Sequence, residues 1–129
     1  MKLPISAIIL TYNEELNIDR CLKSIKDWVS EIFIVDSYST DGTAQIVKRY
    51  GAKMVEHPFE NQAEQFNWAL DNLDIKSDWI LRLDTDEQIL PELWQEIAEM
   101  LPKTPQEIAG FYIKRRVYFM GRWIKHGGY

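Results

Sequence analysis

Short apolar runs alternate with amphipathic segments along this chain, and the alternation indicates the fold. The runs are rich in Ile and Val and have the length of strands rather than helices, so we interpret them as buried strands. They lie at residues 5–10, 31–36, 53–56 and 79–83. Strands that alternate with helices form a parallel sheet with helices packed against it. We therefore predict an α/β domain with a mostly parallel sheet and helices on both faces.

The segments between the runs carry signals for helix starts and ends. Asn13 is placed to cap a first helix, and Asn61 with Glu64 forms a capping pair before a later one. Pro91 fits the first position of the last helix, whereas Gly51 ends the helix that follows the second strand. The apolar residues expected to face the core from these helices are Ile18, Leu22, Ile25, Val29, Ala44, Ile46, Val47, Tyr50, Phe66, Leu70, Leu73, Leu93, Ile97 and Leu101.

Composition narrows the class of protein. The 129 residues, of which 46% are apolar and 27% charged, suit one globular domain, so we take residues 1–129 as a single domain. Cys21 is the only cysteine, which excludes an internal disulfide and favours a core position on a helix face. No apolar run approaches the roughly 20 residues that span a bilayer, and the first residues lack a cleavage-site pattern. These features favour a cytoplasmic location.

The net charge of −5 is unevenly distributed. Residues 1–107 carry all 20 Asp and Glu residues and 10 of the 15 Lys and Arg residues, so residues 108–129 are basic and contain no acid. Aromatic and β-branched residues favour strand within residues 110–120. This segment is either an ordinary strand pair that balances the acidic body or a surface for phosphate, nucleic acid or an anionic membrane.

Polar residues follow three of the predicted strands. In a parallel α/β sheet, ligands bind beyond the carboxyl ends of the strands, so these residues are the first candidates for a site. They are Thr11, Tyr12, Asn13 and Glu14 after the first strand, Asp36 and Ser37 after the second, and Asp84, Thr85, Asp86 and Glu87 after the fourth.

The acidic triplet Asp84-Thr85-Asp86 requires a chemical explanation. Side chains two residues apart along an extended chain point the same way, so both carboxylates are expected on one side. Two anions that close repel, and either one takes up a proton or a cation lies between them. Mg²⁺ or Mn²⁺ suits the second option, because such ions take carboxylate, water and phosphate oxygens as ligands. The chemistry this favours is departure of a nucleotide diphosphate.

Other chemistries find less support in the sequence. Asp36 has two open readings, as a cap for the next turn or as an acceptor for a base or ribose. The chain has no glycine-rich dinucleotide or phosphate-loop motif, and His57 and His126 lack the spacing of a zinc site. His57 beside Pro58 is interpreted as structural. A nucleotidyltransferase is disfavoured because residues 5–15 contain no Gly, Lys or Arg.

Three motifs in register carry a resemblance to a known family. The runs ISAIILTYNEELNIDRCLKSI, IFIVDSYSTDGT and LRLDTDE resemble the inverting glycosyltransferases of family 2, whose catalytic domain has the GT-A fold. The later run FYIKRRVYFMGRWIKHGG is similar to bacterial members that build lipopolysaccharide core or related surface glycans. The resemblance implies transfer of a sugar from a nucleotide-diphosphate donor, with a UDP-sugar favoured, to a glycan or lipid-linked acceptor.

The resemblance also implies roles for individual residues. Asp84 and Asp86 match the catalytic acids of the family, with Asp86 the direct ligand of Mg²⁺ or Mn²⁺ and Asp84 near the ribose and metal. Asp36 stands where an Asp meets the base, and the segment of Gln62, Gln65 and Asn67 resembles one that frames the donor sugar, although Gln65 and Phe66 replace the usual Ala and Arg. The donor-nucleotide residues so implied are Thr11, Tyr12, Asn13, Glu14, Asp36, Ser37, Gln65 and Asp84.

The acceptor side is less complete. Family members use an acid on a later segment as general base, and we find no candidate before Tyr129, where a motif that normally continues breaks off. We therefore expect the chain to be the donor-binding, N-terminal part of a longer protein, and keep a noncatalytic nucleotide-binding module as the alternative. Arg115, Arg116 and Trp123 are candidates for binding the acceptor at the cytoplasmic face of the inner membrane. Nucleic acid is not expected as a partner, because the acidic body repels it.

Overall fold

The structure is a computed structural model that describes residues 2–77, 79–101, 110–113 and 117–121. Its elements in chain order are β1 (Leu3–Thr11), α1 (Ile18–Ile25), β2 (Val29–Asp36), α2 (Thr43–Arg49), β3 (Lys53–Glu56), α3 (Gln62–Asn72), β4 (Trp79–Arg82), α4 (Pro91–Met100), β5 (Gly110–Ile113) and β6 (Val117–Gly121).

All six strands join one sheet in the order β3-β2-β1-β4-β6-β5. The four strands from β3 to β4 run parallel, and β6 lies antiparallel to both β4 and β5. The parallel part confirms the predicted strands, and β5 and β6 form an antiparallel pair, in agreement with the strand tendency of residues 110–120. Because parallel neighbours end at the same edge, the residues that follow β1, β2 and β4 gather there.

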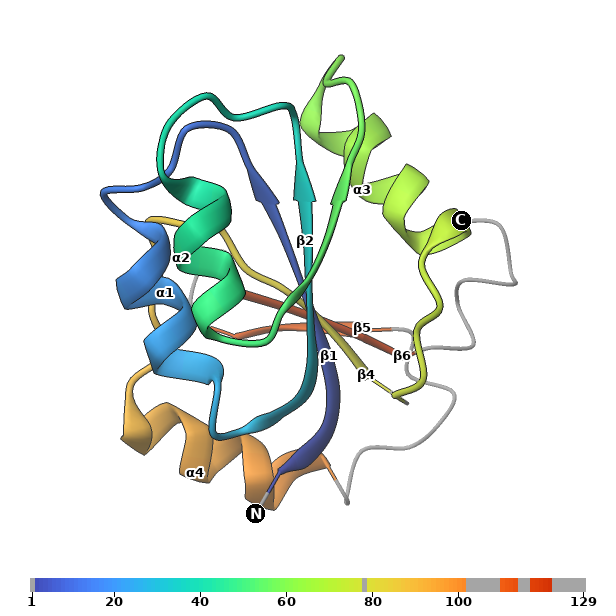
Figure 1. The fold of residues 1–129 in the computed structure, drawn as a ribbon. Coiled ribbons are helices and arrows are strands. Elements are labelled where there is room, and N and C mark those ends of the chain that lie inside the picture. Colours follow the sequence, from blue (N-terminus) through green and yellow to red (C-terminus); the bar gives the residue numbers. More distant parts are fainter. Residues whose placement is uncertain (1, 78, 102–109, 114–116, 122–129) are drawn as a thin grey trace.

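Helices cover both faces of the sheet, as predicted (Figure 1). On one face α1, α2 and α4 pack over the side of β1 that carries Ile5, Ala7 and Ile9. On the other face α3 packs through Phe66 and Leu70 against a second cluster. β1 is buried on both faces because nearly every residue of it is apolar, which is the pattern of a central parallel strand.

Local signals in the sequence set most helix boundaries. The Asn61 side chain accepts a hydrogen bond from the Glu64 amide at 2.8 Å, which confirms the predicted capping pair. Pro91 occupies the first turn of α4, where its missing amide hydrogen costs no hydrogen bond. Gly51 ends the turn after α2 with φ of 66°, a left-handed conformation that a residue without Cβ adopts without strain.

The first helix differs from the prediction. α1 begins at Ile18, and its N-cap residue is Asn17 rather than Asn13. Asn13 has φ of 51° and lies in the preceding loop, where its side chain bonds to another loop instead of capping a helix. Val29, predicted on the helix face, is the first residue of β2.

The core face of α4 also differs. Leu93 is only half-buried, whereas Trp94 is completely buried and stacks on Trp28 with ring centroids 5.6 Å apart. The Trp94 indole donates to the Ser24 carbonyl at 2.7 Å, so its one polar atom is satisfied. Ile97 and Leu101 are buried, as predicted.

Candidate functional site

The ends of β1 and β2 are joined by a buried polar contact. Thr11 pairs with Asp36 in register, and the Thr11 hydroxyl donates to Asp36 Oδ1 at 2.6 Å. Ser39 donates its hydroxyl to the same oxygen at 2.6 Å and its amide to Asp36 Oδ2 at 2.7 Å. Asp36 is completely buried, so its carboxylate accepts three hydrogen bonds within the chain. Asp36 therefore caps the turn after β2, and its role as an acceptor for a base or ribose stays a prediction.

A second set of bonds locks the loop after β1 to the loop after β2. The Asn13 amide donates to the Ser39 hydroxyl at 2.8 Å, and the Thr40 amide donates to Asn13 Oδ1 at 2.8 Å. One residue further on, the Glu14 amide donates to Thr43 Oγ1 at 2.9 Å. Asn13 and Tyr38 both have positive φ, of 51° and 61°. Such strained conformations persist only where surrounding contacts hold them, as these bonds do.

Asp41 completes the junction of the two loops. Its carboxylate accepts bonds from the Thr43 amide at 3.0 Å and the Glu15 amide at 3.2 Å. Burial tends to raise the pKa of Asp41, but the bonds from Thr43 and from the Glu15 amide outweigh it and hold that pKa below its usual value. The two loops are therefore one hydrogen-bonded unit at the edge of the sheet.

A pocket of about 550 Å³ opens at this edge. Tyr12, Tyr38 and Phe59 lie on its walls with 57%, 52% and 53% of their surface exposed. Exposed aromatic rings around a cavity of this size suit a flat ligand that stacks, and neighbouring hydroxyl, amide and carboxylate groups suit its polar edges. The lining residues are Leu10, Thr11, Tyr12, Glu14, Ser37, Tyr38, Pro58, Phe59 and Gln62.

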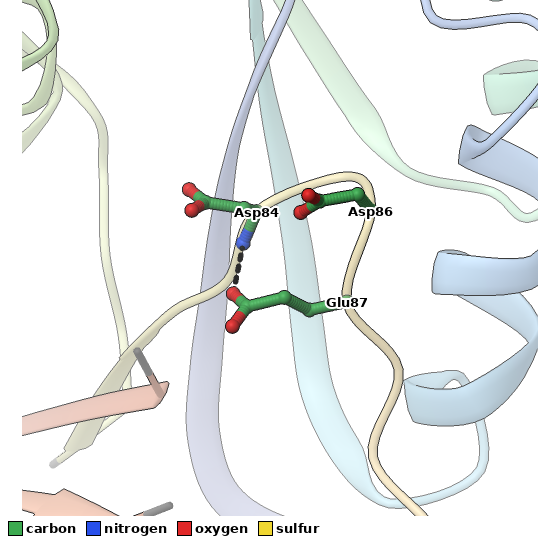
Figure 2. Close-up of side chains that lie close together, drawn as sticks. All are labelled: Asp84, Asp86 and Glu87. Carbon is green, nitrogen blue, oxygen red and sulfur yellow. Dashed lines mark hydrogen bonds between the residues drawn. The ribbon is translucent and has the colours of Figure 1, made fainter. Parts of the chain in front are cut away.

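The acidic cluster lies on the turn after β4. Ligand oxygens of Asp84, Asp86 and Glu87 come within 4.8 Å of one another. Figure 2 shows their carboxylates projecting toward the same side of the turn. The Glu87 amide donates to the Asp84 carbonyl and the Asp84 amide to Glu87 Oε1, both at 3.0 Å, and these bonds close the turn. The two Asp carboxylates thus share a side as predicted, but a turn and not strand alternation brings them there.

Neighbouring elements fix where this turn lies. Arg82 is level with Ile8 of β1, and the Leu83 amide donates to the Ile8 carbonyl at 3.4 Å, so the acidic residues emerge at the same sheet edge as Thr11. On α1, the Cys21 thiol donates to the Asp84 carbonyl at 3.7 Å. The Ser24 hydroxyl accepts from the Ile89 amide at 3.1 Å. Helix α1 therefore holds the turn at two points.

The negative charge of the acidic cluster affects the pKa of the Cys21 thiol. Burial, and then the negative charges of Glu87, Asp84 and Asp86, raise the pKa of the Cys21 thiol to about 12. The thiol is completely buried and belongs to the core, as predicted. Three carboxylates together form an oxygen-only donor set, which fits a hard divalent cation such as Mg²⁺ or Mn²⁺.

The structure divides the predicted donor-site residues into groups. Thr11, Tyr12, Glu14 and Ser37 line the pocket. The other four lie outside its lining: Asn13 in the loop junction, Asp36 beneath it, Gln65 buried behind the wall, and Asp84 in the acidic turn. Arg115, Arg116 and Trp123, the predicted acceptor residues, lie outside the described residues.

Several residues of the site were not predicted from the sequence. Tyr38, Pro58 and Phe59 line the pocket, yet none was predicted there. Glu87 was noted only as following the fourth strand, although it completes the acidic cluster. Large aromatic residues in turn-rich segments such as SYST and HPFEN were the available signal. Among the described residues, no helix combines the length and apolar character needed to cross a bilayer.

Comparisons with known proteins match this geometry. The sequence profile described as Glycosyl transferase family 2 matches residues 6–128. An uncharacterized glycosyltransferase from Rickettsia felis is 42% identical over 103 residues, covering 80% of this chain and 36% of that protein. The lipopolysaccharide core biosynthesis glycosyltransferase LpsC from Rhizobium meliloti is 35% identical over 125 residues, covering 93% of this chain and 45% of that protein. The chain thus spans less than half the length of either relative.

A solved structure extends the likeness to the fold. Glucosyl-3-phosphoglycerate synthase from Mycobacterium tuberculosis, in complex with UDP, superposes with a TM-score of 0.70 at 21% identity, covering 92% of this chain and 56% of that one. The same synthase with Mn²⁺, UDP and glucosyl-3-phosphoglycerate gives a TM-score of 0.67 at 19% identity over the same shares. The expected GT-A fold is therefore confirmed.

Proposed function

Because this chain belongs to glycosyl transferase family 2, we propose that it binds a nucleotide-diphosphate sugar, with a UDP-sugar favoured, for transfer to a glycan or lipid-linked acceptor. The observation that carries the proposal is the meeting of an aromatic pocket and an acidic turn at one edge of the sheet. The aromatic rings of the pocket can stack on a base, and a cation bound by the acidic residues can contact the diphosphate.

The acidic turn is the proposed metal site. Asp84, Asp86 and Glu87 would hold Mg²⁺ or Mn²⁺, with Asp86 as the most exposed of the three ligands. A bound divalent ion neutralises charge on the diphosphate as it leaves. The M. tuberculosis synthase with this fold was crystallised with Mn²⁺ and UDP, which supports the same pair of ligands here.

The nucleotide is proposed to lie between the two loops and the segment after β3. Tyr12 and Tyr38 would flank the base on the loop side, and Phe59 on the opposite wall. Ser37 and Thr11 supply polar groups to the lining of the pocket. Asp36 would act from beneath by holding Thr11 and Ser39 in place, since its own oxygens are already bonded within the chain.

The acceptor side of the proposal rests on relatives. LpsC is named for lipopolysaccharide core biosynthesis, so a cell-envelope glycan is the proposed acceptor class. Arg115, Arg116 and Trp123 remain the proposed acceptor contacts, and a location in the cytoplasm at the inner membrane remains proposed with them. Inversion requires a base that removes the acceptor proton as the hydroxyl attacks opposite the leaving diphosphate. We assign none of the described carboxylates to that role.

Turnover distinguishes the transferase from a noncatalytic nucleotide-binding module. UDP-glucose or another UDP-sugar is incubated with the protein, Mn²⁺ and an envelope extract as acceptor, and UDP release is followed with a coupled enzyme assay. The proposal predicts release that depends on the extract and is lost in Asp86→Asn. Binding of UDP without any release from a panel of UDP- and GDP-sugars would instead favour the module.

A further inference from the structure

Gln65 lies behind the wall of the pocket and bonds to both sides of it. The residue is completely buried in the first turns of α3. Its Nε2 lies 3.1 Å from the Ser37 hydroxyl and 3.2 Å from the His57 carbonyl, and its Oε1 lies 2.6 Å from His57 Nδ1. One buried amide therefore joins the end of β2, the end of β3 and helix α3.

The hydrogen-bonding chemistry fixes the direction of these bonds. A peptide carbonyl only accepts, so the Gln65 atom that faces the His57 carbonyl must be the amino group. The amide oxygen then faces His57 Nδ1, and because that oxygen also only accepts, Nδ1 must carry the proton. The structure thus requires His57 with a hydrogen on Nδ1.

The imidazole itself is held by a second contact. Its ring stacks on Trp68 of α3 with centroids 4.0 Å apart and planes 23° from parallel. Trp68 packs against the core cluster beneath α3. The imidazole is therefore held between the buried Gln65 amide and the half-buried ring of Trp68, both on α3, and these contacts connect α3 to the segment that leads into Pro58.

The residues tied by Gln65 lead directly into the pocket. Ser37 lines one wall, and the residues after His57, Pro58 and Phe59, line the other. Gln62, one turn earlier on α3, lines it as well. The Gln65 bonds therefore add a side-chain link between Ser37 and the segment of Phe59, beside the backbone bond from the His57 amide to the Asp36 carbonyl at 2.9 Å.

We propose that Gln65 is a positioning residue that sets the separation of the two pocket walls through the Ser37 hydroxyl and the protonated Nδ1 of His57, and so controls affinity for the nucleotide. This inference rests on the proposed function, and it assigns Gln65 a role behind the pocket instead of a direct contact. Leucine at this position would fill similar space but leave His57 Nδ1–H and the His57 carbonyl without partners.

The test measures UDP affinity by calorimetry in the presence of Mn²⁺. Gln65→Leu is expected to weaken UDP binding by about tenfold or more, since buried donors and acceptors lose their partners and the walls relax. Gln95→Leu, at an exposed position of α4, is the matched control and should leave the affinity unchanged.

A pair of His57 variants separates positioning from general stability. In His57→Asn the side-chain amino group stands near the place of Nδ1–H and can still donate to Gln65 Oε1, whereas the longer side chain of His57→Gln places its amino group elsewhere. Both lose the ring stacked on Trp68. Because loss of the ring is common to both variants, affinity for UDP should be higher in His57→Asn than in His57→Gln. The ¹⁵N shifts of His57 should show hydrogen on Nδ1 in the wild type and lose that preference in Gln65→Leu.

The outcomes separate this inference from the proposed function. If the wild type binds neither UDP nor GDP, the proposed function fails and this inference fails with it. If the wild type binds UDP while Gln65→Leu, folded by circular dichroism, binds equally well, the inference is overturned and the proposed function stands. Equal affinities of His57→Asn and His57→Gln would also overturn it.

Discussion

The Thr11 hydroxyl donates to the Asp36 carboxylate at 2.6 Å where the two residues form the last in-register pair of β1 and β2. Both residues are buried, and Asp36 also accepts hydrogen bonds from the amide and hydroxyl of Ser39 in the loop after β2. Thr11 and Asp36, which were predicted to bind the nucleotide, thus have a structural role, because their hydrogen bonds hold the loops beside the pocket in place.

Replacing Asp36 should destabilise the fold. In Asp36→Ala the Thr11 hydroxyl and the Ser39 amide lose a charged acceptor, so the free energy of unfolding should fall by about 2–4 kcal/mol. Urea unfolding followed by circular dichroism measures the change. Asp71→Asn, an exposed acid on α3, is the control and should change the stability little. Equal stability of the two variants would show that the Asp36 bonds contribute nothing.

The acidic turn should bind Mn²⁺ through all three carboxylates. Asp84→Asn, Asp86→Asn and Glu87→Gln should each weaken Mn²⁺ binding by about tenfold or more, because each removes a charge and a ligand. Electron paramagnetic resonance of free Mn²⁺, recorded with UDP present, gives the affinities. Glu96→Gln on the exposed face of α4 is the control. Wild-type affinity in Glu87→Gln would remove that residue from the proposed ligand set.

Much of the fold follows from local sequence. The apolar runs, the Asn61 and Glu64 capping pair and Pro91 act over a few residues, so their structural consequences were predictable. Asn13 was misjudged because its side chain bonds to Thr40, a partner 27 residues away that no local pattern reveals. An Asn that precedes acidic residues looks like a helix cap until that partner is known.

The candidate site was predictable only in part. The strand-end rule located Thr11, Tyr12 and the two Asp residues of the triplet, because parallel strands bring their ends to one edge. It did not reveal that Gln65 turns inward, since its partners Ser37 and His57 come from two other segments. The opposite wall at Phe59 was missed for the same reason, because it depends on how β3 leads into α3.

Cys21 should be inert in the folded protein. Its thiol is buried and its pKa is raised to about 12, so almost no thiolate exists at pH 8. A disulfide reagent such as Ellman's reagent should therefore react only as fast as the protein unfolds, and rapidly in urea. Cys21→Ala supplies the blank. Rapid reaction of the native protein would mean that the contact between Cys21 and the acidic turn opens readily.

Glu31 should make the free energy of unfolding depend on pH in the acidic range. Burial tends to raise the pKa of Glu31, but bonds from the Ser6 hydroxyl and the Lys76 amide, with the Lys53 ammonium at 3.1 Å, lower it below its usual value. Because the pKa of Glu31 is lower in the folded than in the unfolded protein, Glu31 takes up its proton in the unfolded chain first as the pH falls. The stabilisation is therefore complete at neutral pH, and it is lost as the pH falls through the folded pKa.

Unfolding in urea across a series from about pH 7 to pH 3 tests this behaviour. Glu31→Gln should show a shallower loss of stability in acid than the wild type. The control is Glu60→Gln, an exposed acid, whose acid dependence should follow the wild type. An identical acid slope in Glu31→Gln would contradict the assignment.

Calorimetric titration of the protein with UDP and with GDP, each in Mn²⁺ and again in EDTA, tests most directly whether the pocket and the acidic turn form a nucleotide site. We predict one UDP site per chain in Mn²⁺, weaker binding of UDP by about tenfold or more in EDTA, and weaker binding of GDP than of UDP. Absence of binding by both nucleotides in both conditions would contradict this prediction.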